Sequence, residues 1–199
     1  RESKPLAQER IDLHDAIGRV LAENIIADSD LPPFDRSQMD GYAVKAADTR
    51  TVPATLKIAG ESAAGRGWHK ALKKGEAVRI MTGAPVPNGA DAVQKIELTK
   101  EDGGSVTIFE PTEEGRYIIR KGSEVKKGKT VLPAGEVITP GNIAVPAAFG
   151  YAKVKVAKRP RVAIFSTGTE IVEINKKPKQ DQIRNSNSLM LSALCQAAG

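Results

Sequence analysis

The sequence predicts a multidomain chain in which an α+β region is followed by the start of an α/β domain. Short β-rich runs separated by turn residues fill the stretch from about Thr51 to Glu110, which indicates a compact β-rich module. After Lys158-Arg159-Pro160, which is typical of a linker, an apolar run leads into polar residues and then into a helical segment. That order is typical of α/β proteins.

The first element that we expect is an amphipathic helix near the N-terminus. Asp12 is a typical N-cap residue, because its side chain can accept a hydrogen bond from a backbone N–H of the first turn. Apolar residues then recur at the spacing of one helical face: Leu13, Ile17, Val20 and Leu21. The pattern predicts a helix over residues 12–21.

The β-rich module comes next. Turn residues bound four runs with the composition of strands: Ala54–Ala59, Ala77–Met81, Ala90–Leu98 and Ser105–Phe109. Gly103-Gly104 lies directly before the last run, and a glycine pair in that place is typical of a hairpin turn. We therefore expect a hairpin at this point of the module.

A second helix and a further strand are predicted after the module. Thr139-Pro140 is typical of an N-cap followed by the first helical residue, and Gly150 is typical of a helix end. The helix should run to Phe149, although Pro146 predicts a kink or an earlier end. Alternation of apolar and polar residues in Ala152–Ala157 predicts a strand.

The last part of the chain predicts an α/β unit. Arg161–Phe165 is a short apolar run suited to a buried parallel strand. A helix is expected over Leu189–Ala198, with Asn187 or Ser188 available as its N-cap. One strand and one helix cannot form a sheet core, so either the chain is a fragment of a longer protein or the remaining strands come from elsewhere. Of the two, we expect a fragment.

The composition excludes some classes of protein and leaves others open. The chain has 199 residues, 40% hydrophobic and 27% charged, with a net charge of +6, which suggests anionic partners. The basic runs at 116–129, 153–161 and 176–179 are either solvated faces or surfaces that attract oxyanions. Neither interleaved aromatic residues nor a groove-reading motif accompanies them, so no nucleic-acid partner is expected. No apolar stretch would span a bilayer and no signal-peptide pattern is present, which predicts a cytoplasmic protein without a membrane partner.

The densest polar motif is the run from Leu31 to Val44, which reads LPPFDRSQMDGYAV. Its two prolines restrict the backbone and favour an extended segment. Gly41 directly after Asp40 permits a turn that would place the carboxylate at the apex. A purely structural Asp-Gly turn is an equal alternative from this motif alone.

Two further polar clusters lie beside the predicted α/β elements. Ser166–Glu170 follows the predicted strand directly, and Ile183–Ser188 precedes the last helix. Small hydroxyl residues and a glycine at the end of a strand can present donors to a phosphate or another oxyanion. Helix capping explains one residue of the second cluster but not the whole run. The sequence therefore predicts a ligand site at the ends of these elements.

Four motifs together resemble one family along nearly the whole chain. They are PFDRSQMDGYA at 33–43, RIMTGAPVP at 79–87, LPAG at 132–135 and FSTGTE at 165–170. In this order they resemble the signatures of the molybdopterin molybdenumtransferases, the MoeA proteins of bacteria and archaea, which are related to gephyrin and its plant counterpart. The resemblance implies an elongated N-terminal domain formed by residues 1–36 and 123–158, with an inserted β-rich lid domain at 37–122. Residues 159–199 would be the truncated beginning of a molybdopterin-binding α/β domain.

The resemblance also implies a reaction and its site residues. Family members insert molybdate into adenylylated molybdopterin, release AMP and use Mg²⁺. The catalytic residues would be Asp40, Thr82 and Glu124, although a solvated glutamate is an equal alternative at Glu124, where relatives often have an aspartate. Asp40 and Glu170 would hold the metal. The expected contacts with substrate come from Ser37, Ser166, Thr167, Gly168, Glu170, Asn185, Ser186 and Asn187.

Partners follow from the resemblance as well. It implies a homodimer with active sites shared between subunits, and the molybdopterin adenylyltransferase as a further partner. A gephyrin-like scaffold without transferase activity is the alternative from another functional class. Nonspecific binding of nucleic acid through the basic runs is a third, and it predicts a steep dependence on salt.

Overall fold

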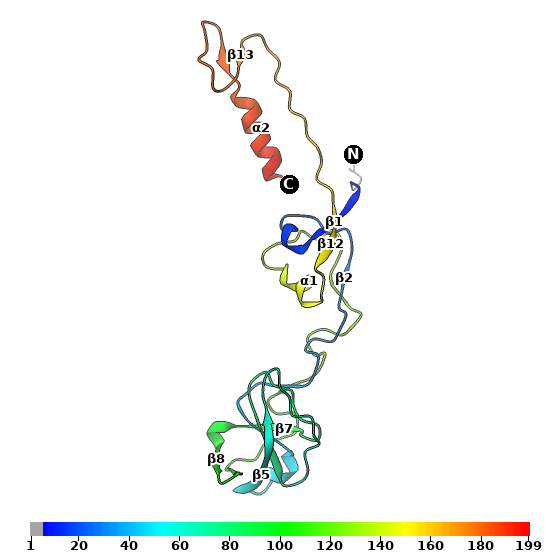
Figure 1. The fold of residues 1–199 in the computed structure, drawn as a ribbon, viewed down its shortest axis with the longest axis vertical. Helices are drawn as coiled ribbons and strands as arrows, with labels where there is room; N and C mark the ends of the chain where they lie inside the picture. Colours follow the sequence, from blue (N-terminus) through cyan, green and yellow to red (C-terminus); the bar gives the residue numbers. More distant parts are fainter. Residues whose placement is uncertain (1–5) are drawn as a thin grey trace. The chain divides into compact units, whose positions relative to one another are not determined.

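The computed structural model describes residues 6–199 and consists mostly of β-structure with few helices (Figure 1). It divides into two compact units. Unit 1 comprises the residues up to Ile25 together with Thr130–Gly199, and unit 2 comprises Ile26–Lys129. Unit 1 is therefore assembled from two separated segments, and unit 2 is the contiguous stretch between them.

Unit 2 is built around one six-stranded sheet with the strand order β7-β4-β6-β5-β9-β8. Strands β5 and β6 pair in parallel, and the other neighbours in the sheet are antiparallel. Figure 1 labels three of these strands at the lower end of the view. The bounds are β4 (Gly41–Val44), β5 (Ala54–Ser62), β6 (Glu76–Ile80), β7 (Ala92–Lys95), β8 (Thr99–Asp102) and β9 (Ser105–Ile108).

Both faces of this sheet are covered, because successive side chains of a strand point to opposite faces. Tyr42 and Val44 of β4 contribute to one apolar cluster, and Ala43 between them contributes to the other. The first cluster also contains Leu56, Ala77, Ala92, Val106 and Ile108, and the second contains Leu72, Val78, Ile80, Ala84, Val93 and Ile118. All four residues of β4 are buried, so β4 is a central strand that anchors the residue directly before it.

The predicted strands of the module are confirmed, with one change. β5, β6 and β9 match three of the predicted runs, whereas the run 90–98 forms a strand only over Ala92–Lys95 and continues as the 3-10 helix η3 (Ile96–Leu98). Gly103 and Gly104 form the predicted hairpin turn between β8 and β9, with φ angles of 53° and 84°. Positive φ at both central residues is typical of the turn that suits a two-residue hairpin.

A buried tyrosine connects the sheet to its edge strand. Tyr42 is 1% exposed, and its hydroxyl donates to Glu101 Oε2, which also lies 3.5 Å from Arg79 Nη1. Burial, together with the hydrogen bond to Glu101, raises the pKa of Tyr42 to about 12. Tyr42 therefore stays neutral at physiological pH.

Shorter elements complete unit 2. β3 (Arg36–Ser37) pairs antiparallel with β10 (Ile118–Ile119), and the 3-10 helix η2 (Ala46–Thr49) follows β4. This pairing joins the Arg36–Ser37 part of the polar motif to the segment Ile118–Ile119, from which the chain runs on towards Lys129 at the end of unit 2. The motif is therefore held by backbone hydrogen bonds on both of its sides.

Unit 1 packs around two strand pairs. β1 (Gln8–Asp12) pairs antiparallel with β12 (Lys153–Ala157), and β2 (Ile25–Ile26) pairs with β11 (Thr130–Leu132). The strand predicted at 152–157 is thus confirmed by β12. The buried core of the unit consists of Ala16, Leu21, Ile25, Leu132, Ile138, Val154 and Val156.

The predicted N-terminal helix over 12–21 is wrong. β1 ends at Asp12, the 3-10 helix η1 covers only Leu13–Asp15, and Gly18 has a φ of 75°. Val20 and Leu21 instead form bridges to Val137 and Val156. The helical spacing of apolar residues was misleading because pairing with distant strands overrides local propensity.

The predicted helix over 139–149 is confirmed only over α1 (Ala144–Ala148). Thr139 and Asn142 hydrogen-bond each other through side chains and backbone amides, which stabilises a turn before the helix. Pro146 lies within the first turn of α1, where a missing N–H costs little. The predicted end is confirmed, since Phe149 caps the helix and Gly150 has a φ of 77°.

Residues 159–199 contain a parallel pair, β13 (Ile171–Val172) with β14 (Ile183–Arg184), and the helix α2 (Ser186–Ala197). The strand predicted at Arg161–Phe165 is wrong: the segment forms no strand, and Phe165 is 86% exposed. A strand requires a neighbour for its backbone groups, and no described residue pairs with this segment. The predicted last helix is confirmed but begins earlier, with Asn185 as its N-cap instead of Asn187 or Ser188.

Across residues 6–199 no helix combines the length and apolar character that crossing a membrane requires.

Candidate functional site

Asp40 and Thr82, which the sequence predicts as catalytic residues, lie together. Asp40 directly precedes β4 and Thr82 follows β6, and these strands are antiparallel neighbours with Gly41 opposite Ile80. Asp40 Oδ1 accepts two hydrogen bonds from Thr82, at 2.6 Å from the backbone N and at 2.8 Å from Oγ1. The sheet register therefore places a carboxylate and a hydroxyl side by side on the surface of unit 2.

The hydrogen bonds also set the charge of this pair. The backbone N–H of Thr82, followed by its hydroxyl, holds the pKa of Asp40 below its ordinary value. Asp40 is exposed and ionised at physiological pH. Both hydrogen bonds use Oδ1, so among residues 6–199 no hydrogen-bond donor occupies Oδ2. The second carboxylate oxygen is free to contact a ligand.

Gly41 allows the close approach that places Asp40. A Cβ at Gly41 would lie 1.9 Å from the backbone oxygen of Gln94 and 2.9 Å from the backbone nitrogen of Ile96. Gln94 belongs to β7, which pairs with β4. Ile96 is bonded to the residue before β4, since its N donates to Asp40 O at 3.0 Å. No side chain fits there, which explains the glycine of the Asp-Gly pair physically.

Ser37, predicted to contact substrate, is buried and satisfied locally. Its hydroxyl donates to Met39 O at 2.6 Å and accepts from Met39 N at 3.2 Å. Its backbone bonds Gly83 and Ala84 in the turn that carries Thr82. Its position thus holds the two halves of the Asp40–Thr82 site together, and a substrate contact at Ser37 stays a prediction.

Glu124, the third predicted catalytic residue, forms an ion pair with Arg36. Glu124 Oε1 lies 3.0 Å from Arg36 Nη2, and both side chains are partly exposed. Beside it Asp35 accepts from Arg120 Nη1 at 2.7 Å and from Lys121 N at 2.7 Å. Among the hydrogen bonds of residues 6–199, none joins Glu124 to Asp40 or Thr82. Its catalytic role therefore stays a prediction.

Acid is expected to weaken unit 2 through Asp35. Partial burial opposes its ionisation, but the hydrogen bonds from the Lys121 amide and the Arg120 guanidinium outweigh burial and lower the pKa of Asp35. A carboxyl group with a lowered folded-state pKa stabilises the fold above its unfolded-state pKa and loses this contribution as pH falls through the folded-state value. We expect the urea midpoint of the chain to fall below about pH 4.

The variant Asp35→Asn measures that contribution. It should cost about 1 kcal/mol at neutral pH, given the partial exposure of the pair. Its urea midpoint should then fall less on acidification than that of the wild type. An equal fall in both proteins would contradict the assignment.

A second polar cluster in unit 1 brings Ser166 and Asn185 together. Asn185 Oδ1 accepts from Ser188 N and from Ser166 Oγ, each at 3.1 Å, and Ser166 Oγ also contacts Ser188 Oγ. The asparagine thus caps α2 and ties the 165–170 segment to its N-terminus. An open hollow of about 270 Å³ lies beside these residues and is lined by Phe165, Ser166, Thr167, Ile171, Ile183, Arg184, Asn185, Ser186, Asn187 and Leu191.

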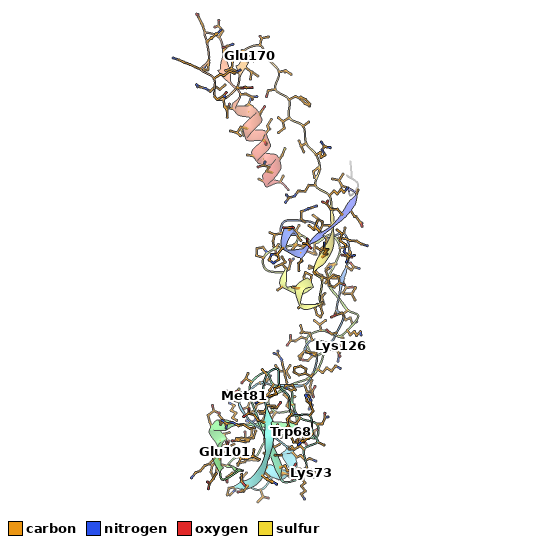
Figure 2. The ribbon with its side chains drawn as sticks, viewed as in Figure 1. Trp68, Lys73, Met81, Glu101, Lys126 and Glu170 are labelled. Atoms are coloured by element: carbon orange, nitrogen blue, oxygen red, sulfur yellow. The ribbon has the colours of Figure 1, made fainter. Side chains whose placement is uncertain are left out.

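Glu170 directly precedes β13, and Figure 2 labels it. A Cβ at Gly168 would lie 2.5 Å from both carboxylate oxygens of Glu170, so the carboxylate folds back over the glycine. Neither residue lines the hollow, whereas Thr167, Ser186 and Asn187 do. The structure thus places three more of the predicted residues around this hollow, and their contacts with a substrate stay predictions.

The predicted metal ligands Asp40 and Glu170 belong to different units. Within the described part of the chain, no three residues among His, Cys, Asp and Glu gather in the manner of a metal site. Asp40 with Thr82 nevertheless offers a carboxylate oxygen beside a hydroxyl. Oxygen donors of this kind suit Mg²⁺, which commonly takes one or two carboxylates and completes its shell with water and substrate phosphates.

Two partners in these clusters were not predicted as site residues from the sequence. Ser188 belongs to the polar cluster at 183–188, where the sequence singles it out only as a possible N-cap, yet it also contacts Ser166. Arg120, which pairs with Asp35, was part of a basic run assigned to solvent or oxyanions. A serine in the first turn of a helix and an arginine far from its aspartate in sequence give no local signal, because the fold alone creates these pairs.

Comparison with known proteins places these features in a family context. Residues 1–150 match the family model described as MoeA N-terminal region (domain I and II). Over 193 residues the chain is 42% identical to a molybdopterin molybdenumtransferase of Staphylococcus aureus, covering 95% of this chain and 46% of that protein. It is 39% identical over 193 residues to a protein of the same name from Staphylococcus epidermidis, with the same coverage.

Two solved structures of MoeA proteins also match nearly the whole of this chain. A molybdopterin biosynthesis MoeA protein from Pyrococcus horikoshii OT3 has a TM-score of 0.89 and 37% identity, covering 96% of this chain and 52% of that one. A second structure from the same species has a TM-score of 0.88 and covers 98% of this chain and 51% of its own. The chain therefore spans about half the length of the relatives that it matches.

Proposed function

Because this chain belongs to the MoeA family, we propose that it serves molybdenum cofactor biosynthesis as part of a molybdopterin molybdenumtransferase. The reaction proposed is the insertion of molybdate into adenylylated molybdopterin with release of AMP. The observation that best supports this proposal is the contact of Asp40 with Thr82. It joins two motifs that resemble those of the family and are distant in the sequence. The names of the relatives favour the transferase over a scaffold without activity.

Asp40 and Thr82 are proposed to act at the phosphate end of the substrate. The ionised carboxylate of Asp40, with Oδ2 directed to no protein donor among residues 6–199, and the Thr82 hydroxyl would hold Mg²⁺. When bound there, the ion would neutralise charge on phosphate oxygens. The Thr82 amide keeps Asp40 oriented, because a carboxylate fixed by a backbone N–H does not rotate freely. Glu124, which is paired with Arg36 of β3, is proposed as a further catalytic residue, and Ser37 of β3 is proposed as a contact with the substrate.

The hollow in unit 1 is proposed to bind the pterin or a phosphate of the substrate. Ser166, Thr167 and Asn185 offer hydroxyl and amide groups at its wall, and Ser186 and Asn187 present backbone at the N-terminus of α2. Gly168 lets the segment turn tightly, and Glu170 is proposed as a further contact with the substrate or its cation. The mixed donors and acceptors suit a heterocycle with amide-like edges.

We further propose the domain limits given by the resemblance, with a lid domain at 37–122 and the start of the molybdopterin-binding domain at 159. Active sites shared between the subunits of a homodimer, delivery of substrate by the molybdopterin adenylyltransferase and a cytoplasmic location complete the proposal. The partial coverage of its relatives supports the view that these 199 residues supply only part of each active site.

The decisive experiment measures AMP release from adenylylated molybdopterin, with molybdate and Mg²⁺, by a full-length protein that contains this chain. We expect release that depends on molybdate. The 199-residue chain alone should release AMP at less than about one hundredth of that rate, because it lacks part of the site. An equal rate from the isolated chain would refute the shared site. A full-length protein without activity that is retained by a partner peptide would favour the scaffold.

A further inference from the structure

Ser62 is a buried polar residue that the proposed site does not use. It is the last residue of β5 and is fully buried at 0% exposure, in a stretch of strand that carries no motif. Its hydroxyl donates to Pro85 O at 2.7 Å and accepts from Trp68 N at 3.4 Å. Its backbone oxygen accepts from Met81 N at 3.1 Å. One residue therefore bonds both ends of the Met81–Pro85 turn.

The Met81–Pro85 turn is the segment that presents Thr82 to Asp40. The turn closes on itself through Ala84 N, which donates to Met81 O at 3.0 Å. Ser37 bonds its middle, and Ser62 bonds its two ends, so the turn is held from β3 on one side and from β5 on the other. A loss of the Ser62 hydroxyl would leave the carbonyl of Pro85 without that donor.

The loop after β5 supports Ser62 from outside. Figure 2 labels Trp68 and Met81 in this part of unit 2. A Cβ at Gly60 would lie 2.5 Å from Trp68 Nε1, and a Cβ at Gly67 would lie 3.1 Å from Pro85 Cγ. The Trp68 indole thus packs against β5 at Gly60, and the backbone of Gly67 packs against Pro85. The hydroxyl of Ser62 is hydrogen-bonded to the backbone of both Trp68 and Pro85.

We propose that Ser62 is a positioning residue, whose bonds to the Met81–Pro85 turn fix Thr82 at the distance from which it binds Asp40. Its importance for catalysis rests on the proposed function, because it acts only through Thr82. The hydroxyl is suited to this role because it donates and accepts at once, and a partly buried carbonyl left without a donor is costly.

The test compares Ser62→Ala with a matched control, Thr49→Val. Thr49 is also fully buried in unit 2, donates to Ala46 O at 3.0 Å and accepts from Thr112 N at 3.0 Å, but has no hydrogen bond to the Met81–Pro85 turn. Both variants lose a buried hydroxyl of the same bonding pattern. The measurement is the rate of amide hydrogen exchange in the 199-residue chain. The rate at Thr82 reports a local effect, and the rate at Val106 of β9 reports general destabilisation.

We expect Ser62→Ala to speed exchange of the Thr82 amide about tenfold or more relative to Val106, and Thr49→Val to leave that ratio unchanged. Ser62→Cys, with a similar shape and a weak donor, should fall between wild type and Ser62→Ala. An unchanged ratio in Ser62→Ala would overturn the proposal.

AMP release by the full-length protein supplies the second readout. Ser62→Ala should lower its rate about tenfold, with Thr49→Val close to wild type. Equal losses in the two variants would overturn the positioning role. If the wild type releases no AMP, the proposed function fails while the exchange ratio still decides whether Ser62 positions Thr82.

Discussion

Replacing Asp40 by asparagine is expected to lower molybdate-dependent AMP release about 100-fold or more in the full-length protein. Asparagine keeps an oxygen that can accept both hydrogen bonds from Thr82, so the local fold should survive. It removes the negative charge, which is the property that a cation requires of a carboxylate ligand. The loss should therefore appear in kcat, and urea unfolding should show that the variant is still folded.

Asp48 provides the matched control for this change. Asp48 Oδ2 accepts a hydrogen bond from Gly75 N at 2.8 Å, so it too is an aspartate that receives a backbone N–H in unit 2. Asp48→Asn should leave AMP release unchanged. At the partner position, Thr82→Ser should stay near wild type and Thr82→Val should lose about tenfold, because only valine lacks the hydroxyl. Full activity in Asp40→Asn would remove Asp40 from the mechanism.

Gly41→Ala is expected to destabilise unit 2 by about 3 kcal/mol or more. The new Cβ would lie 1.9 Å from the backbone oxygen of Gln94 on the edge strand β7. This backbone is paired with β4 along the whole strand, so it cannot move aside as a flexible side chain can. Relief requires β4 and β7 to separate, which would break the pairing of Gly41 with Lys95. Urea unfolding followed by circular dichroism measures the loss.

Gly103→Ala is the control for the glycine effect itself. Gly103 has a φ of 53°, and a Cβ there would meet nothing within 4 Å. Its cost should be about 1 kcal/mol, from backbone conformation alone. Similar losses in the two variants would show that conformation, not the contact with Gln94, makes Gly41 necessary.

The β-rich part of the fold was predictable because its signals are local. Strand composition and the Gly103-Gly104 turn predicted β6 and β9 to within one residue of their observed bounds, and β5 with an end three residues too early. The N-terminal helix failed for the opposite reason: β1 exists only because β12 lies beside it, and no window around residue 12 contains that partner. The strand expected at Arg161–Phe165 failed because an apolar run becomes a strand only where another strand pairs with it.

The candidate site also has one part that the sequence predicts and another that only the structure shows. Asp40 and Thr82 could be named from their motifs, and the structure adds that one is bonded to the other through the register of β4 and β6. The burial of Ser37 and the pairing of Glu124 with Arg36 could not be predicted, since both depend on β3 and β10 meeting. Ser62 gave no signal at all, because a serine at the end of a strand is ordinary until its neighbours in space are known.

The assembly of unit 1 from two separated segments fixes an order of events during synthesis. Unit 2 is contiguous and can fold as soon as Lys129 has left the ribosome, whereas β1 must wait for β12, since Gln8 pairs with Ala157. At ordinary rates of translation β1 remains without its partner strand for on the order of ten seconds. Folding of unit 2 in that interval brings the ends of the intervening chain together and lowers the entropy lost when β1 and β12 finally meet. A defect in the sheet of unit 2, such as that expected of Gly41→Ala, would therefore also delay the maturation of unit 1, to which Gly41 does not belong.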